Sequence, residues 1–328
     1  MTAGTLDGHV YLQSYLAPFA EILARTDVTD IYVNAPEEIW AETVGGRIER
    51  HSIPGLDTVT LARLGRQIAA YAHQGISREH PILSATLPGG ERVQIVAPPA
   101  TRGGVVLAIR KHVSSDLGLD DYVSSGAFQL DLQPESNISE TLRRQLESKD
   151  IAGLLRTAVN ARRNILISGG TSTGKTTFLN ALIREIPKEE RLILIEDTPE
   201  LHLHHPNAVG LIAPRSALGE ALVTAEDLLR ASLRMRPDRI ILGELRGLEA
   251  YTFLRAVNTG HPGSMTTVHA DSPERAIEQI ALLVLQGGTT LRREDVTHYI
   301  RSTIDVFVQL SRTAGRRSVS EVALRGEI

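Results

Sequence analysis

The 328-residue sequence contains no cysteine. This absence excludes disulfide bonds, cysteine-ligated zinc and thiol redox chemistry. The sequence also has no excess of positive charge, because 35 Lys and Arg residues are set against 39 Asp and Glu residues, for a formal net charge of -4. Overall basicity of the kind that gathers nucleic acid is therefore lacking, and any contact with DNA would have to be local.

Long hydrophobic runs are lacking as well. No apolar stretch approaches the ~20 residues of a membrane span, and the opening residues, MTAGTLDGHV, have neither a basic nor an apolar section of the kind found in a signal peptide. We therefore expect a protein that is neither secreted nor membrane-spanning. The length is sufficient for two hydrophobic cores.

The segment 165–178, ILISGGTSTGKTTF, carries the strongest functional signal. An apolar strand runs into the pattern G-x-x-x-x-G-K-T and then into an amphipathic helix, which is the context of a phosphate-binding P-loop. Gly169 and Gly174 permit the tight turn that lets successive N–H groups cradle a triphosphate at the helix N-terminus. The predicted nucleotide-binding residues are Gly169, Gly170, Thr171, Ser172, Thr173, Gly174, Lys175, Thr176 and Thr177. Lys175 is expected on the β- and γ-phosphates and Thr176 on Mg²⁺.

The chain divides into two regions joined by a linker. Residues 1–112 mix short helices with strand-like stretches and predict a smaller α+β N-terminal domain. Residues 113–137 are rich in Ser, Gly, Asp and Pro, which is typical of a linker. Residues 138–328 are expected to form the ATPase domain. In the first region, the clearest predicted strands are 30–40 and 92–97, and 61–73 reads as a helix.

In the second region, strands alternate with helices. The predicted strands are 165–168, 192–195, 239–243, 265–269 and 304–310, and 138–163 is predicted to be helical. This alternation predicts an α/β fold with a mostly parallel, doubly wound sheet. Such sheets bind ligands outside the carboxyl ends of their strands.

Phosphoryl transfer needs a carboxylate to position water, a group that senses the γ-phosphate, and positive charge. Glu244 follows the strand RIILG, in which Gly243 replaces the usual metal-binding aspartate. We therefore expect Mg²⁺ to be held by Thr176, phosphate oxygens and water, with Glu244 acting through water or as general base. His269, at another strand end, is placed to hydrogen-bond a γ-phosphate.

Three other patterns leave alternatives open. Glu196 and Asp197 end a buried-type strand, but a following Thr-Pro makes a plain turn equally consistent. The histidines of LHLHHP at 201–206 suggest a metal site or, since no acidic or cysteine ligand is suitably spaced, polar positions of an edge strand. Arg156, Arg162 and Arg163 form either a contact with DNA or membrane or a solvated helix face.

Four stretches in chain order resemble the Walker A, Asp box, Walker B and His box of the secretion traffic ATPases. They are GGTSTGKTT, IEDTPEL, RMRPDRIILGELRG and NTGHPGSMTTVHADSP, and the last is similar to the type IV secretion and conjugation branch. Upstream, VTDIYVNAPEEIW and PILSATLPGGERVQIV resemble the N-terminal domain of that family. The resemblance implies a RecA-like ATPase that hydrolyses ATP with Mg²⁺ to power substrate export or pilus assembly.

The same resemblance implies an assembly and its surroundings. The chain is expected to form a homohexamer, cytoplasmic and peripheral on the inner membrane, with secretion-channel and coupling proteins as partners and no stable nucleic-acid complex. The alternatives are a DNA-translocating hexameric ATPase, a type II secretion or pilus motor of the same superfamily, and a ring that only scaffolds its partners.

The resemblance also implies roles for individual residues. Glu196 and Glu244 are expected on Mg²⁺ and the attacking water, beside Lys175 and Thr176 on phosphate and metal, with His269 near the γ-phosphate. Arg92 and Arg110 match N-terminal-domain arginines that reach the nucleotide. Because the linker 113–137 is flexible in composition, these arginines could act within one subunit or, by a domain swap, between neighbours.

Overall fold

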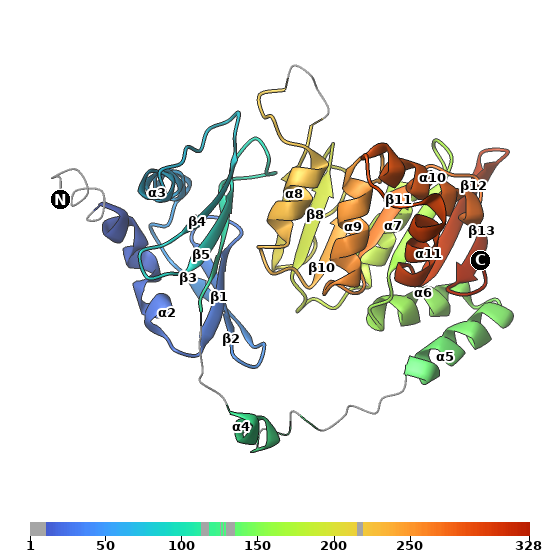
Figure 1. The fold of residues 1–328 in the computed structure, drawn as a ribbon, viewed down its shortest axis with the longest axis horizontal. Coiled ribbons are helices and arrows are strands. Elements are labelled where there is room, and N and C mark those ends of the chain that lie inside the picture. The colour runs from blue at the N-terminus through green and yellow to red at the C-terminus, as the bar shows by residue number, and fades with distance from the viewer. Residues whose placement is uncertain (1–10, 113–117, 125, 127, 129–134, 215–218) are drawn as a thin grey trace.

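The computed structural model describes residues 11–112, 118–124, 126, 128, 135–214 and 219–328. It confirms the predicted α/β class. A six-stranded antiparallel sheet forms the N-terminal domain, and a seven-stranded, mostly parallel sheet with helices on both faces forms the C-terminal domain (Figure 1).

The N-terminal sheet has the strand order β3-β2-β1-β6-β5-β4. Its strands are β1 (Val28–Val33), β2 (Glu38–Thr43), β3 (Ile48–Ser52), β4 (Ile82–Thr86), β5 (Arg92–Val96) and β6 (Val106–Arg110). The stretch 30–40, predicted as one strand, is instead divided between β1 and β2, because the chain turns through Glu37 at a φ of 64°. Helix α3 (Thr58–Tyr71), η1 (Ala17–Phe19) and α2 (Ala20–Ala24) cover this sheet and bury a separate core.

The C-terminal sheet has the order β13-β12-β7-β11-β10-β8-β9. Its strands are β7 (Ile165–Gly169), β8 (Leu192–Glu196), β9 (Ala208–Ile212), β10 (Arg239–Leu242), β11 (Met265–Val268), β12 (Val306–Thr313) and β13 (Arg316–Leu324). Among these pairings, β12 with β13 is antiparallel and the others are parallel. The five predicted strands are therefore confirmed, and the edge strands β9 and β13 were not predicted. Residues 201–206, where an edge strand was one alternative, precede β9.

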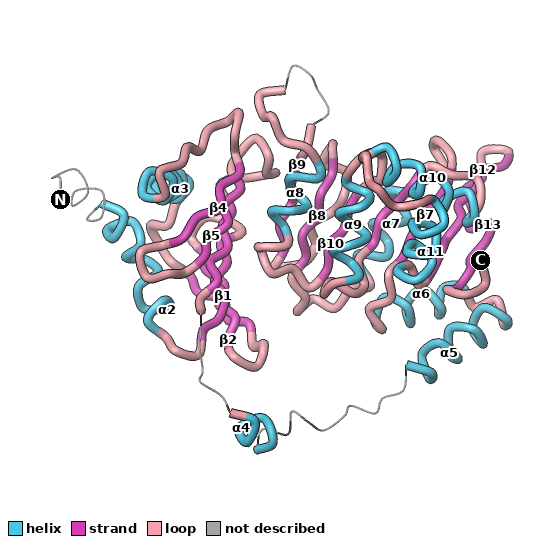
Figure 2. Tube along the Cα trace, viewed as in Figure 1, coloured by secondary structure: helices cyan, strands magenta, loops and turns pink. Residues whose placement is uncertain are grey.

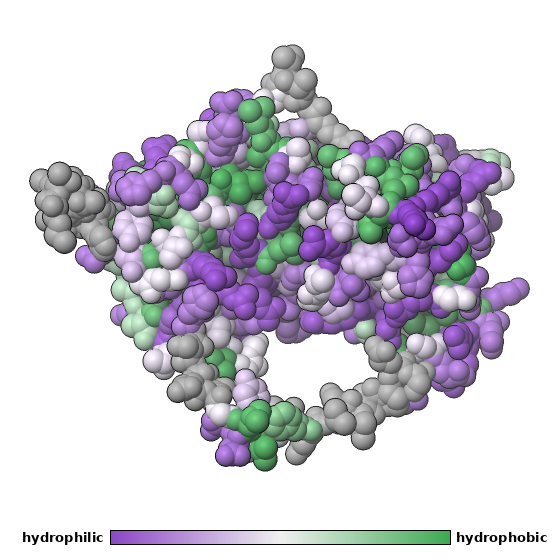
Figure 3. Space-filling model, in the orientation of Figure 1, coloured by the Kyte–Doolittle hydropathy of each residue, from purple (hydrophilic) through white to green (hydrophobic). Residues whose placement is uncertain are grey.

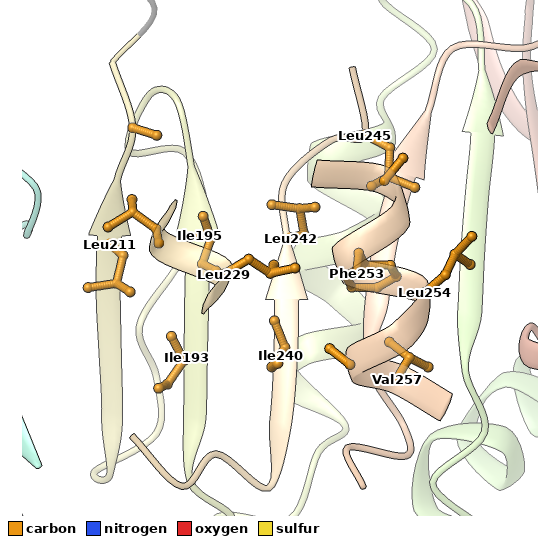
Figure 4. Packing of buried hydrophobic residues seen from close by; sticks show 14 of the residues in the cluster. Ile193, Ile195, Leu211, Leu229, Ile240, Leu242, Leu245, Phe253, Leu254 and Val257 are labelled. Atoms are coloured by element: carbon orange, nitrogen blue, oxygen red, sulfur yellow. The ribbon is translucent and has the colours of Figure 1, made fainter. Parts of the chain in front are cut away.

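Alternation along the strands sorts the apolar side chains onto the two faces of this sheet. Ile193 and Ile195 of β8 face α8 (Ala225–Ser232), α9 (Glu249–Asn258), α10 (Pro273–Gln286) and α11 (Arg293–Thr303), as Figure 4 shows for part of this core. Leu192 and Leu194 face α6 (Ile151–Asn160) and α7 (Lys175–Arg184) instead. Figure 2 shows helices on both sides of the magenta strands. Both faces are covered, as the run of apolar residues in each strand requires.

Two helices lie between the domains in sequence, α4 (Leu119–Ser124) and α5 (Glu135–Glu147). The helix predicted over 138–163 is instead divided into α5 and α6, since Lys149 has a φ of 59° and Asp150 caps α6 by accepting from Gly153 N. The predicted linker 113–137 contains α4 and the start of α5, and many of its other residues lie outside the described part. In Figure 3 apolar side chains are exposed on α4, which contributes no described residue to the three cores. Within the described ranges, no helix is long and apolar enough to cross a membrane.

The two domains contact each other along β9. Thr101, in the loop between β5 and β6, forms an antiparallel bridge with Leu211. One hydrophobic cluster includes Tyr32, Trp40 and Val106 of the N-terminal domain together with β9 residues. The N-terminal domain thus lies against the free edge of the C-terminal sheet.

Candidate active site

The P-loop joins β7 to α7, and its geometry requires glycine at two positions, Gly169 and Gly174. A Cβ atom on Gly169 would lie 2.5 Å from Thr173 Oγ1 and 3.0 Å from the Leu310 carbonyl oxygen. Gly174 occupies the N-cap of α7 at a φ of 93°, where a side chain would be strained. The N–H groups at the start of α7 therefore line the turn that the sequence predicts to bind phosphate.

Lys175 lies at the centre of this loop. Its Nζ donates to the carbonyl oxygens of Gly169 at 2.9 Å and Gly170 at 3.3 Å, and it lies 3.3 Å from His269 Nε2. Burial lowers the pKa of Lys175, while Glu244 opposes this shift. The ammonium group is thus held at the loop.

Two predicted side chains converge on Lys175 from neighbouring strand ends. Glu244 comes directly after β10 and Gly243, and His269 comes directly after β11. His269 Nε2 lies 3.3 Å from Glu244 Oε1, so Lys175, His269 and Glu244 form a chain of contacts. Parallel pairing of β10, β11 and β7 produces this convergence, because it brings their carboxyl ends to one side of the sheet.

Arg246 belongs to the same cluster and was missed by the sequence reasoning. Its guanidinium pairs with Glu244 and also donates to Asp197 Oδ2 at 2.8 Å. The hydrogen bond to Glu244 raises the pKa of Arg246, which keeps the guanidinium charged. A signal was present, since Arg246 follows Glu244 by two residues at a predicted strand end, but the sequence did not show that it would turn back to the carboxylates.

Glu196 is the buried member of the Glu196–Asp197 pair, with a relative exposure of 6%. Its Oε2 accepts from the N–H groups of Glu200 at 2.8 Å and Leu201 at 2.9 Å, and its Oε1 pairs with Arg102. The carboxylate therefore closes the turn after β8 and also lines a cavity of about 300 Å³ with Glu244 and Arg246. Its Cβ would lie 3.3 Å from a Cβ on Gly243, which explains why a small residue stands there.

The donors available for Mg²⁺ are the hydroxyl of Thr176 and the carboxylate of Glu244. Oε1 of Glu244 is buried and accepts no hydrogen bond from the residues that the structure describes, and its partner there is His269 Nε2 in the ion pair at 3.3 Å. Its remaining acceptor capacity fits a water-mediated metal contact. Both oxygens of Glu196 already have partners. Across the described ranges, no group of three or more His, Asp or Glu side chains is arranged to hold a metal by itself. His202 and His204 therefore belong to no such group among the described residues.

Arg92 and Arg110 lie away from the cluster of Lys175, Glu244 and His269. They line a cavity of about 1030 Å³ together with Arg234, Arg236 and His261. Arg236 and His261 precede β10 and β11, at the amino ends of the strands and thus opposite the P-loop. The structure does not bring Arg92 and Arg110 to the P-loop of their own chain. The N-terminal arginine that reaches a predicted site residue is Arg102.

Comparison with known proteins places this geometry in context. The model of the family described as type II/IV secretion system protein matches residues 13–321. The chain is 41% identical over 324 residues to the type IV secretion system protein VirB11 of Bartonella henselae, covering 94% of this chain and 91% of that protein. It is 42% identical over 306 residues to VirB11 of Brucella suis, covering 90% and 84%.

A solved structure is similar over nearly the whole length. The crystal structure of the VirB11 ATPase from the Brucella suis type IV secretion system, in complex with sulphate, has a TM-score of 0.90 and 38% identity and covers 98% of this chain and 97% of that one. The type IV secretion system protein PtlH of Bordetella pertussis is 38% identical over 315 residues, covering 92% of each chain. These likenesses confirm the predicted resemblance to the type IV branch.

Proposed function

Because the chain belongs to the type II/IV secretion system protein family and is an ATPase, we propose that it forms a homohexameric ring that hydrolyses ATP to power substrate export or pilus assembly by a type IV secretion or conjugal transfer system. The observation that carries the proposal is the contact chain from Lys175 through His269 to Glu244 beside the P-loop. It supplies the cation, the γ-phosphate contact and the carboxylate that phosphoryl transfer needs.

In the proposed reaction, the triphosphate lies on the N–H groups of residues 169–177. Lys175 exchanges the Gly169 carbonyl for the β- and γ-phosphates. Glu244 orients the attacking water and accepts its proton, while His269 hydrogen-bonds the γ-phosphate. Mg²⁺, held by Thr176 and through water by Glu244, would neutralise charge on the phosphate oxygens.

Glu196 contributes to the same cavity in this proposal. Because its two oxygens are engaged by backbone N–H groups and Arg102, we assign it to shaping the water and metal environment, and Glu244 to activating water. Arg246 holds Glu244 and Asp197 together across β8 and β10.

In the proposed ring, each P-loop receives arginines from a neighbouring chain. We propose that Arg92 and Arg110 face the P-loop of a neighbouring copy, which the separation of these arginines from their own P-loop supports. The proposed place of action is the cytoplasmic face of the inner membrane, with secretion-channel and coupling proteins as partners. Such heterologous contacts close into rings when the rotation between copies is suitable.

The proposal is tested with purified protein at micromolar concentration in ATP and Mg²⁺. Light scattering should give the mass of six chains, and ATP turnover should be the same with and without single-stranded DNA. Lys175→Ala should bind ATP weakly and turn it over at background rate, whereas the exposed Lys188→Ala should match the wild type. In the parent secretion system, Lys175→Ala should stop substrate transfer. A stable monomer, a symmetric dimer, or turnover that requires DNA would contradict the proposal.

A further inference from the structure

Arg102 connects the N-terminal domain to the catalytic sheet. The loop between β5 and β6 lies along the free edge of β9, where Arg102 N donates to the Gly210 carbonyl at 3.0 Å and Ile212 N donates to the Ala100 carbonyl at 2.9 Å. With the bridge from Thr101 to Leu211, these bonds make the loop a short added strand. The backbone of Arg102 is therefore fixed relative to the end of β9.

The side chain of Arg102 then crosses β9 to reach the active site. A Cβ atom on Gly210 would lie 2.6 Å from Arg102 Cδ, so the absence of a side chain at Gly210 creates the passage. At the far end, Nη1 of Arg102 donates to the Leu201 carbonyl and Nη2 pairs with Glu196 Oε1. The side chains of Arg102 and Glu196 are only 17% and 3% exposed, so solvent screens this pair weakly.

The charges around Glu196 indicate what its ion pair with Arg102 does. Glu196 shares a cavity with Asp197 and Glu244, so three carboxylates lie close together there. Arg246 pairs with Glu244 and Asp197, but Arg102 is the cation that the structure pairs with Glu196. A buried carboxylate that loses its cation is costly, even with two backbone N–H donors.

We infer that Arg102 is a positioning residue for ATP hydrolysis: it balances the charge of Glu196 and fixes its carboxylate in the cavity shared with Glu244. The N-terminal domain thus completes the active site of its own chain, separately from any contact that Arg92 or Arg110 makes with a neighbouring chain. This inference rests on the role proposed above for Glu196 in the site.

The test compares Arg102→Ala, Arg102→Lys, Glu196→Gln and the double variant Arg102→Ala/Glu196→Gln in full-length protein. Arg102→Ala should lower kcat by about 10- to 100-fold with KM little changed, since a hydrogen bond to a charged group is lost at the reacting end of the site. Arg102→Lys should restore part of the rate, because it keeps the charge and loses the second donor. In the Glu196→Gln background, Arg102→Ala should cause little further loss, because its effect passes through that carboxylate.

Two further measurements separate positioning from a purely structural role. In Arg102→Ala, the acid limb of the kcat–pH profile should move to higher pH, since an unpaired carboxylate among acids is protonated more easily. Gly210→Ala should reproduce the fall in kcat by displacing the Arg102 side chain from its passage. The matched control is Arg78→Ala, which removes another arginine that pairs across the domains, with Glu220, at an exposed position. It should leave kcat and the pH profile unchanged.

The outcomes distinguish this inference from the proposed function. If Glu196→Gln retains wild-type turnover, the role proposed for Glu196 is wrong. If Glu196→Gln is impaired while a folded Arg102→Ala keeps both the wild-type kcat and the wild-type pH profile, the inference about Arg102 is wrong and the role of Glu196 stands. Fully additive losses in the double variant would also overturn it, because they would show that Arg102 acts by another route.

Discussion

The guanidinium carbon of Arg191 lies 3.9 Å from the centre of the Tyr32 ring, which joins the start of β8 to β1 of the other domain. Arg191 is 1% exposed, and burial lowers its pKa to about 10, so it remains charged at neutral pH. Its Nη1 donates to Asn34 at 2.8 Å and also to Asn207, while its Nε donates to the Met235 carbonyl at 3.0 Å. This contact fixes the N-terminal domain to the amino ends of the strands.

The Arg191 contact leads to a prediction about stability. Arg191→Met keeps most of the side-chain volume but leaves the acceptors on Asn34, Asn207 and Met235 without this donor. We expect the free energy of unfolding to fall by about 2 to 4 kcal/mol, because buried polar groups then lack partners. Urea unfolding followed by circular dichroism measures this, with the exposed Arg63→Ala as the control. A loss below the error of that control would show that the stacked pair contributes nothing.

Glu244 and Glu196 are separated by a pair of matched amide variants. Glu244→Gln should bind ATP with nearly unchanged affinity and lose about 10²- to 10⁴-fold in kcat, the usual contribution of a general base. Glu196→Gln should lose less, since its backbone hydrogen bonds can be made by an amide oxygen. Single-turnover hydrolysis and a nucleotide-binding assay give the two quantities separately. A larger loss for Glu196→Gln would assign the general base to Glu196, at the end of β8, in place of Glu244.

Variants of Arg92 and Arg110 test whether the N-terminal domain acts on the P-loop of its own chain or on that of a neighbouring chain. Either Arg92→Ala or Arg110→Ala should reduce turnover by about 10³- to 10⁵-fold, by analogy with arginine fingers, with a much smaller effect on ADP affinity. If the arginines serve a neighbouring P-loop, mixing Arg92→Ala with the inactive Lys175→Ala should restore part of the activity in mixed rings. In such a ring, Arg92→Ala supplies an intact P-loop and Lys175→Ala supplies an intact Arg92.

The mixing experiment has its own control. Lys175→Ala mixed with Glu244→Gln should stay inactive, because both changes lie in the site of one chain and no neighbour can repair them. Absence of rescue in the Arg92→Ala mixture, with subunit exchange confirmed by labelling, would assign the arginines to their own chain. Wild-type turnover in both arginine variants would show that ATP hydrolysis does not depend on Arg92 or Arg110.

His205 predicts a dependence of stability on pH. Its side chain is 5% exposed, its Nε2 lies 3.0 Å from the Ile186 carbonyl, and its Nδ1 is buried with no hydrogen-bond partner in the described part of the chain. Burial lowers the pKa of His205 below the ordinary value of 6.5. The unfolded chain therefore binds a proton first, so this contribution to stability is complete above about pH 6.5 and is lost as the pH falls towards the folded pKa.

The melting temperature measures this effect. Between pH 7.5 and pH 5.5 it should fall less in His205→Gln than in the wild type, because the variant has no imidazole to protonate. Exposed His298→Gln is the matched control and should follow the wild-type curve. Equal slopes for His205→Gln and the wild type would exclude His205 as a source of acid sensitivity.

Local patterns were sufficient for most of the catalytic sheet. The strands β7, β8, β10, β11 and β12 were predictable because a strand buried on both faces is a continuous apolar run, and Lys175, Glu244 and His269 follow such runs. Two predictions of element boundaries were wrong, at 30–40 and 138–163. In both places one residue at positive φ, Glu37 or Lys149, breaks the pattern. No glycine or proline stands beside Lys149, whereas Pro36 directly before Glu37 was a turn signal that the prediction of a single strand passed over.

By itself, the sequence of this protein determined its P-loop, its α/β class and the strand ends that carry Glu244 and His269, since these depend on residues close together in the chain. Only the tertiary structure decided which arginines meet which carboxylates. Arg102 reaches Glu196 because a loop of one domain extends the sheet of the other and Gly210 leaves space, and Arg92 and Arg110 lie at the opposite end of that sheet. Long, flexible arginine side chains carry little positional information in sequence, so their partners are fixed by how the two domains pack.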